Sequence, residues 1–190
     1  YKMEREVKQE ILTVLQDIQT PLRRGNSAIL NMLSNATLKR ASVYQDEDST
    51  SLAVIIYSLS KICNRPRLNL DPRFLKMKDK VAKELKNAQV ALQKNDIKNY
   101  KRCVRKVFGL IGFFEKKLGM YIVEVLDQAK IKKGGSLYSQ GVSAGRAAQL
   151  LGVSKWDLMG YLGSTKLAES PSEQLPVLQR LEYAKEVFNV

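Results

Sequence analysis

Residues 143–162 constrain the fold of this chain more than any other stretch, and they read SAGRAAQLLGVSKWDLMGYL. Two short helices that cross steeply need a small residue at the crossing and a glycine in the turn between them. Ala148 and Gly152 occupy those two positions, and Ser143 and Ser154 are typical N-cap residues for the first and the second helix. The stretch therefore predicts a helix-turn-helix.

Apolar residues recur every three or four positions along most of the remaining chain, which is the period of an amphipathic helix. No segment shows a strand pattern of convincing length. The spacing predicts helices at residues 3–18 (ended by Pro21), 22–44 (with Gly25-Asn26-Ser27 or Ser34-Asn35 as alternative breaks), 73–93, 97–117, 120–131 (after a break near Gly119) and 172–188. A further helix begins at Asp46-Glu47-Asp48 and contains the apolar residues from Leu52 to Ile62. We expect an all-α fold with an N-terminal helical bundle, a basic central helical hairpin and the C-terminal helix-turn-helix.

The best domain boundary is the connection at residues 64–72, because two prolines restrict the chain there. The predicted parts are an N-terminal helical region at residues 1–65, a basic helical hairpin at 73–133 and a helix-turn-helix with a final helix at 141–190. A polar connection at residues 163–171 would join the last two helices.

The sequence lacks the residues that most often form catalytic and metal sites. The chain has no histidine, which removes the commonest general base and the commonest zinc ligand. Cys63 and Cys103 lack a CxxC partner and are expected to be two reduced thiols. The acidic run 46–48 is expected to begin a helix, with a divalent cation as the alternative. We predict no enzyme, no metal and no cofactor, although carboxylate or lysine chemistry stays open.

The net charge of +13 is concentrated in the middle of the chain. Residues 71–140 hold 17 basic and 7 acidic side chains, whereas residues 141–190 hold 5 of each. Such a charge favours a polyanionic partner, because each neutralised phosphate releases counterions. Since the helix-turn-helix is itself neutral, the helices before it would have to supply the phosphate contacts.

Basic side chains follow the central helices at spacings of three, four and seven, which brings some of them onto a common face. We predict that they contact a nucleic-acid backbone, and the alternative is an ordinary solvated helix exterior. The candidates are Lys101, Arg102, Arg105, Lys106, Lys130, Lys132 and Lys133.

The second helix of a helix-turn-helix enters the major groove of DNA. The candidates for base contacts at its start are Ser154, Lys155, Trp156 and Met159, with Arg146 and Lys166 as nearby cations. Among the base-contact candidates, Lys155 alone can make a strong guanine contact. We expect Trp156 to pack between the two helices rather than to stack on bases.

Residues 141–163, GVSAGRAAQLLGVSKWDLMGYLG, resemble small prokaryotic helix-turn-helix families typified by antitoxin-like proteins of archaea and cyanobacteria. The matching residues are Ser143, Gly145, Ala147, Ala148, Leu150, Gly152, Ser154 and Trp156. The resemblance implies a regulatory role in DNA binding or as an antitoxin, with a toxin-like protein as partner.

No stretch reaches the roughly 18 uninterrupted apolar residues of a membrane span, and the charged start YKMEREVKQE does not resemble a signal peptide. We therefore expect a cytoplasmic protein with no membrane partner. The chain begins with Tyr1 rather than Met, which leaves open that it is a fragment.

These features together predict a nucleic-acid-binding protein, with DNA favoured over RNA, most simply a transcriptional regulator. A homodimer fits this prediction because two half-sites multiply weak contacts. The first alternative is an RNA- or ribosome-associated protein that uses the basic helices for shape-based phosphate contact. The second is an adaptor or antitoxin whose exposed helices bind a partner protein.

Overall fold

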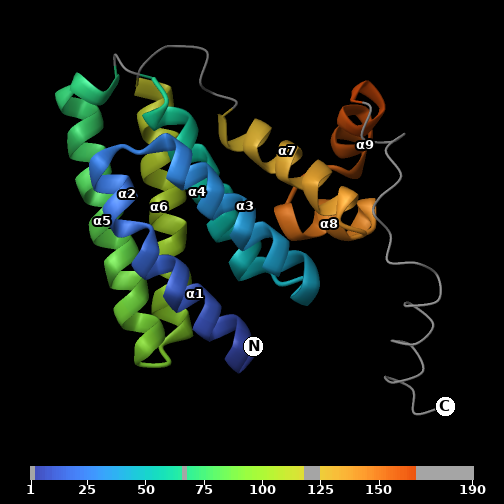
Figure 1. Cartoon of the computed structure of the whole chain (residues 1–190), viewed down its shortest axis with the longest axis horizontal. Helices are drawn as coiled ribbons and strands as arrows, with labels where there is room; N and C mark the ends of the chain where they lie inside the picture. Colours follow the sequence, from blue (N-terminus) through green and yellow to red (C-terminus); the bar gives the residue numbers. More distant parts are fainter. Residues whose placement is uncertain (1–2, 66–67, 118–124, 166–190) are drawn as a thin grey trace.

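The computed structural model of the chain describes residues 3–65, 68–117 and 125–165. Every regular element in these ranges is helical, which confirms the predicted all-α class (Figure 1). The elements are α1 (Arg5–Asp17), α2 (Gln19–Arg24), α3 (Ser27–Tyr44), α4 (Glu47–Cys63), the 3₁₀ turn η1 (Leu68–Leu70), α5 (Pro72–Gln93), α6 (Ile97–Lys117), α7 (Val125–Ser139), α8 (Ala144–Leu151) and α9 (Lys155–Ser164).

Helix α4 is buried along most of its length and contacts α1, α3, α6, α7 and α8. The prediction that the acidic run begins this helix is confirmed, because the Ser49 N–H donates to Asp46 Oδ1 at 2.7 Å. Buried hydroxyls on the helix bond to backbone carbonyls, as Ser58 Oγ does to Val54 at 2.9 Å. The hydroxyls of Thr50, Ser58 and Ser60 therefore enter the interior without losing hydrogen bonds.

One face of α4 belongs to a large hydrophobic cluster that it shares with α1, α2, α3, α5 and α6. Ile55 and Leu59 of α4 are fully buried there, together with Leu15 of α1 and Leu85 of α5. The other face of α4 carries Tyr57, which belongs to a second cluster formed with α7, α8 and α9. The same helix thus joins two hydrophobic clusters.

Helices α5 and α6 form the predicted antiparallel hairpin (Figure 1). Asp71 accepts the Arg73 N–H at 2.8 Å where α5 begins, and Asp96 accepts the Asn99 N–H at 2.9 Å where α6 begins. Asn95 between them has a φ of 59°, a left-handed conformation that asparagine tolerates. These local signals explain why the predicted bounds, 73–93 and 97–117, are confirmed.

Pro21 does not end the helical structure at the N-terminus, contrary to the prediction. Helix α1 ends at Asp17, and Pro21 lies in the first turn of α2, where its missing N–H costs nothing. Gly25, with a φ of 66°, ends α2.

The prediction that a helix ends near residue 131 is wrong, because α7 continues through Gly134 and Gly135 to Ser139. A β-carbon on Gly134 would lie 2.7 Å from Leu158 Cδ1 and 3.2 Å from Leu151 Cδ1. The missing side chain therefore lets leucines of α8 and α9 pack directly against α7. The burial of these leucines offsets the roughly 1 kcal/mol that glycine costs in a helix.

Several predictions fall on residues that the structure does not describe. These are the break near Gly119, residues 166–171 of the polar connection and the helix at 172–188. Gly163 and Ser164, also predicted as connection, belong to the end of α9. None of the described helices combines the length and the apolar character needed to cross a membrane.

We predict that Gly134→Leu destabilises the protein by about 1–3 kcal/mol, because the new side chain overpacks the contact with Leu158 and Leu151. Gly160→Leu is the matched control, since a β-carbon on Gly160 meets nothing within 4 Å. Urea unfolding measures both free energies. The close approach of α9 to α7 is contradicted if both variants are as stable as the wild type.

Candidate nucleic-acid interface

Helices α8 and α9 form where the sequence predicts two crossing helices. Ser143 Oγ accepts the Arg146 N–H at 3.2 Å, and Ser154 Oγ accepts the Trp156 N–H at 3.1 Å. Gly152 ends α8 with a φ of 61°, which a side chain would strain. The two caps and the turn glycine thus have the predicted local roles.

Helix α9 lies against α7 and α8 through its inner face. Leu158 and Leu162 of α9 are buried, as are Ala148 and Leu151 of α8. The outer face of α9 begins with Ser154 and Lys155, which are exposed. The start of this helix is therefore accessible to a partner.

Trp156 does not pack between the two helices, contrary to the prediction. Its side chain is 84% exposed, and Met159 is 46% exposed. The reason is helical geometry, because a residue two positions before Leu158 lies about 200° around the helix from it. Once Leu158 faces α7, Trp156 must face outward.

Arg146 holds α8 to the end of α3. Its guanidinium donates to the Gln45 carbonyl at 2.9 Å and to Gln149 Oε1 at 2.9 Å. A cation at this position also interacts favourably with the negative end of the α3 dipole. The Arg146 side chain therefore bonds within the protein. Lys166, the other cation predicted near the start of α9, lies outside the described residues.

The predicted cations of α6 point toward different neighbours. Lys101 Nζ lies 3.9 Å from Asp48 of α4, whereas Lys106 Nζ lies 3.5 Å from Glu84 of α5. Arg102 donates to Asn99 Oδ1 at 2.7 Å, and Arg105 Nε donates to the Lys101 carbonyl at 3.4 Å. These four side chains do not form one stripe.

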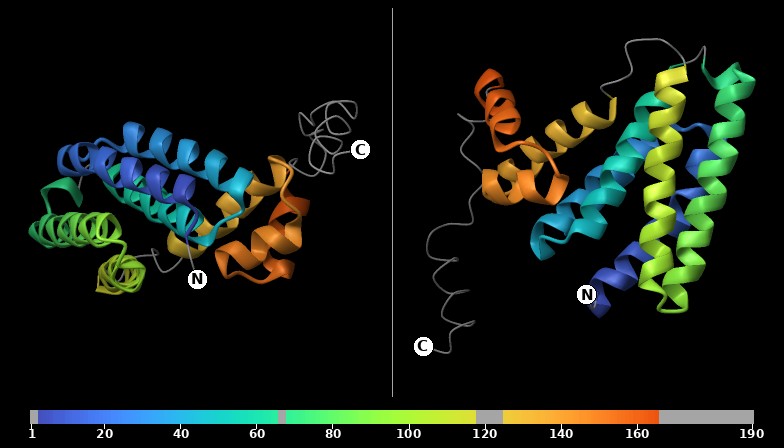
Figure 2. Two further views of the ribbon diagram at one scale, coloured as in Figure 1. Left: turned by 90° about the horizontal axis from the view of Figure 1, so that it is seen from below. Right: turned by 180° about the vertical axis from the view of Figure 1, so that it is seen from behind.

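The α5–α6 hairpin and the α8–α9 pair lie at opposite ends of the molecule (Figures 1 and 2). Helix α4 and α7 stand between them in both views of Figure 2. The cations of α6 and the start of α9 thus belong to two separate surfaces, instead of the single interface expected from the sequence.

The three predicted lysines of α7 have three different environments. Lys130 pairs with Asp127 at 3.7 Å. Lys130 also shares a face of α7 with Gly134, which lies four residues further on and packs against Leu158 of α9. Lys132 is exposed, whereas Lys133 is only 2% exposed. Of the three lysines, Lys130 therefore lies on the side of α7 that faces α9, and Lys133 is not accessible to a phosphate.

Lys133 lies between α7, α3 and α4. Its Nζ donates to Asn35 Oδ1 at 2.8 Å and lies 4.4 Å from the ring centre of Tyr57. The ammonium groups of Lys61 and Lys132 lie 5.1 and 5.9 Å from the same ring. Burial, and then the charges of Lys132 and Lys61, lower the pKa of Lys133 to about 8.

The cysteines and the acidic run do not form a site. Cys63 and Cys103 are both free thiols, as predicted, and burial raises the pKa of each. Within residues 3–65, 68–117 and 125–165, no group of three or more acidic or cysteine side chains is placed to hold a metal ion. Capping therefore accounts for the acidic run at the start of α4.

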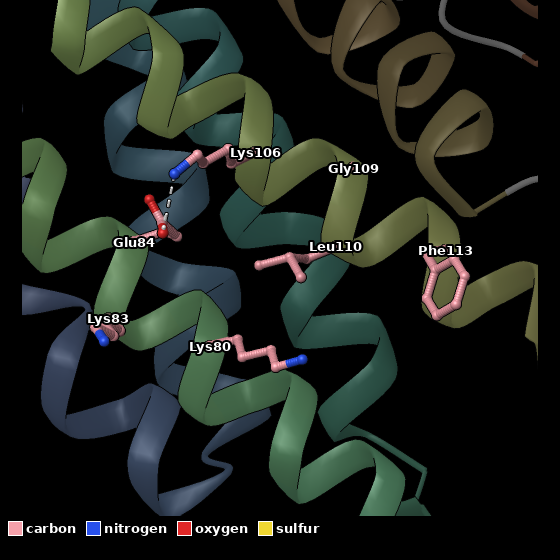
Figure 3. A pocket seen from close by; sticks show the side chains of 7 residues that line it. All are labelled: Lys80, Lys83, Glu84, Lys106, Gly109, Leu110 and Phe113. Carbon is pink, nitrogen blue, oxygen red and sulfur yellow. Dashed lines mark ion pairs between the residues drawn. The ribbon is translucent and has the colours of Figure 1, made fainter.

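Two structural features were missed from the sequence. The first is the close contact at Gly134, which the polar stretch KKGGS at residues 132–136 does not signal. The second is a groove between α5 and α6, lined by Lys80, Leu110 and Phe113 among others (Figure 3). The sequence does not reveal this groove, because it does not show how two helices align.

We predict that the wild type gains stability relative to Lys133→Met as the pH rises from about 8 to 10. The pKa of Lys133 is about 8 in the fold and has its ordinary value of 10.5 in the unfolded chain, so the unfolded chain binds more protons in this window. Below about pH 8 both states are protonated, and the difference in unfolding free energy is constant.

Urea unfolding across this pH range, with exposed Lys39→Met of α3 as the control, measures the effect. A difference between the wild type and Lys133→Met that stays flat up to pH 10 would show that the buried ammonium is not destabilised by its surroundings.

No protein-family model matches the chain, and no curated protein or solved structure matches it either. The resemblance of residues 141–163 to antitoxin-like proteins therefore stays a prediction.

Proposed function

We propose that α7, α8 and α9 form a helix-turn-helix unit that binds duplex DNA, with the start of α9 in the major groove. The observation that carries this proposal is the outward face of α9. Leu158 and Leu162 are buried against the unit, while Ser154, Lys155 and Met159 are exposed together at the start of the helix. A recognition helix needs this combination of a fixed inner face and an accessible N-terminal end.

Phosphate contacts in this proposal come from cations near α9 rather than from the hairpin. Lys130 shares a face of α7 with Gly134, which Leu158 of α9 packs against. Lys155 lies at the start of α9, where the helix dipole also attracts a phosphate. The α6 cations lie at the other end of the molecule (Figure 2). In this proposal they do not contact the DNA segment that α9 binds.

A protein partner is the second candidate, favoured by the composition of the outer face of α9. This face exposes Trp156 and Met159 next to two exposed glycines, Gly160 and Gly163, and it has one cation. Exposed aromatic residues and methionine are enriched in protein interfaces, and glycines let another backbone approach closely. An antitoxin-like role would use this surface.

We predict that Lys155→Gln lowers the preference of the protein for its best duplex by about 1–3 kcal/mol, because the guanine contact is lost. The duplex is first selected from random-sequence DNA with the wild type. Fluorescence anisotropy then compares selected and scrambled duplexes. Ser154 is left unchanged because it caps α9.

Two further variants separate phosphate contact from base contact. Lys130→Gln should weaken binding to all duplexes and reduce the salt slope by about one unit. Lys98→Gln, at the start of α6, is the matched control and should change neither. The DNA proposal is wrong if the wild type selects no duplex, or if Lys155→Gln keeps the full preference.

The protein-partner alternative gives a different pattern. A partner that co-purifies at fixed stoichiometry, is lost with Trp156→Ala and Met159→Ala, and is kept with Lys155→Gln would favour it over DNA binding.

A further inference from the structure

A groove runs along the face of the α5–α6 hairpin that faces away from α1, α2 and α4. It consists of two adjoining depressions of about 430 and 360 Å³. Both depressions are lined by Glu84 of α5 and Lys106 of α6, so they are two halves of one groove. The ion pair of these side chains, 3.5 Å long, spans the groove where the halves meet (Figure 3).

The half of the groove that Leu110 lines has an apolar floor, whereas the other half is lined mainly by polar side chains. Leu110 points from α6 toward α5, and Phe113, 65% exposed, lies at the end of that half (Figure 3). Val90 and Ala91 of α5 line the other half, where Val90 is 42% exposed. Gly109 lies between the ion pair and Phe113, and a β-carbon there would meet nothing within 4 Å.

The rims of the groove are cationic. The five basic residues that line the two halves are Lys80, Lys83, Lys94, Arg102 and Lys106. The two carboxylates are Glu84, which pairs with Lys106, and Asp96, which caps α6. The groove therefore attracts an anionic ligand along its length and offers that ligand an apolar surface in the half lined by Leu110 and Phe113.

The dimensions suit an α-helix. The groove follows α5 from Lys80 to Lys94, about 21 Å at the rise of an α-helix, which is the length of a four-turn helix. Antiparallel helices leave a groove into which the side chains of a third helix pack. The bare backbone at Gly109 allows such a helix to approach closely.

We propose that the α5–α6 groove binds an acidic amphipathic helix of a partner protein. The apolar face of that helix covers Leu110, Phe113 and Val90, and its carboxylates pair with lysines on the two rims. A single-stranded nucleic acid fits less well, because stacking needs aromatic platforms for successive bases and Phe113 is the one aromatic lining residue of the two halves.

The test uses a displayed library of helical peptides of about 16 residues, with one face randomised. The library is selected on the wild-type protein and depleted on Gly109→Leu, whose new side chain fills the groove. This variant should fold with an equal or higher melting temperature, because leucine favours a helix more than glycine does and its β-carbon would meet no atom within 4 Å. A change in binding then reports on the groove and not on folding.

The surviving peptides should carry apolar residues at helical spacing, flanked by Asp and Glu. Fluorescence anisotropy of a synthesised survivor should show a loss of affinity of roughly tenfold or more in Gly109→Leu and in Lys80→Glu with Lys83→Glu. The matched charge control is Lys39→Glu with Arg40→Glu, two exposed cations of α3, and it should bind within a few-fold of the wild type.

Two outcomes would overturn the proposal. In the first, no acidic amphipathic peptide survives depletion, or the survivors bind Gly109→Leu as tightly as the wild type. In the second, a labelled single-stranded RNA of about 20 nucleotides loses its binding in Gly109→Leu while no peptide survives, which would assign the groove to nucleic acid. The outcome is independent of Lys155, so this test can fail while DNA binding by α9 stands.

Discussion

Burial of α4 from several sides sets the positions of the other helices. Its apolar residues fill one cluster with α1, α5 and α6 and a second with α7, α8 and α9. A helix buried in this way can keep serines and threonines only if their hydroxyls bond to backbone carbonyls, as those of Thr50 and Ser58 do. Because α4 lies between the two clusters, the hairpin and the α8–α9 pair are held apart with their outer faces toward solvent (Figure 2).

The same arrangement explains why neighbouring lysines behave differently. Successive residues on a helix point about 100° apart, and α7 is covered by α3 and α4 on one side and by α8 and α9 on another. Lys132 therefore reaches solvent, while Lys133 enters the interior and is kept there by Asn35 and the Tyr57 ring. An excess of positive charge in the middle of a sequence does not by itself make a positive patch.

The local features were predictable because they depend on a few neighbouring residues. The N-caps at Asp46, Asp96, Ser143 and Ser154 follow from side chains that accept an N–H two or three residues later. The errors arise where a distant contact outweighs a local preference. Gly134 favours a helix end locally, but the leucines of α8 and α9 bury against it and keep α7 continuous. The exposure of Trp156 likewise follows from which face of α9 meets α7.

The helical class, most of the helix bounds and the turn at Gly152 follow from local sequence, since periodicity, caps and a left-handed glycine act within a few residues. Local sequence does not predict which lysines are exposed, the groove between α5 and α6, or the separation of this groove from α9. These properties depend on how helices distant in sequence pack around α4. That packing is set by the summed fit of many apolar side chains, which no single segment contains.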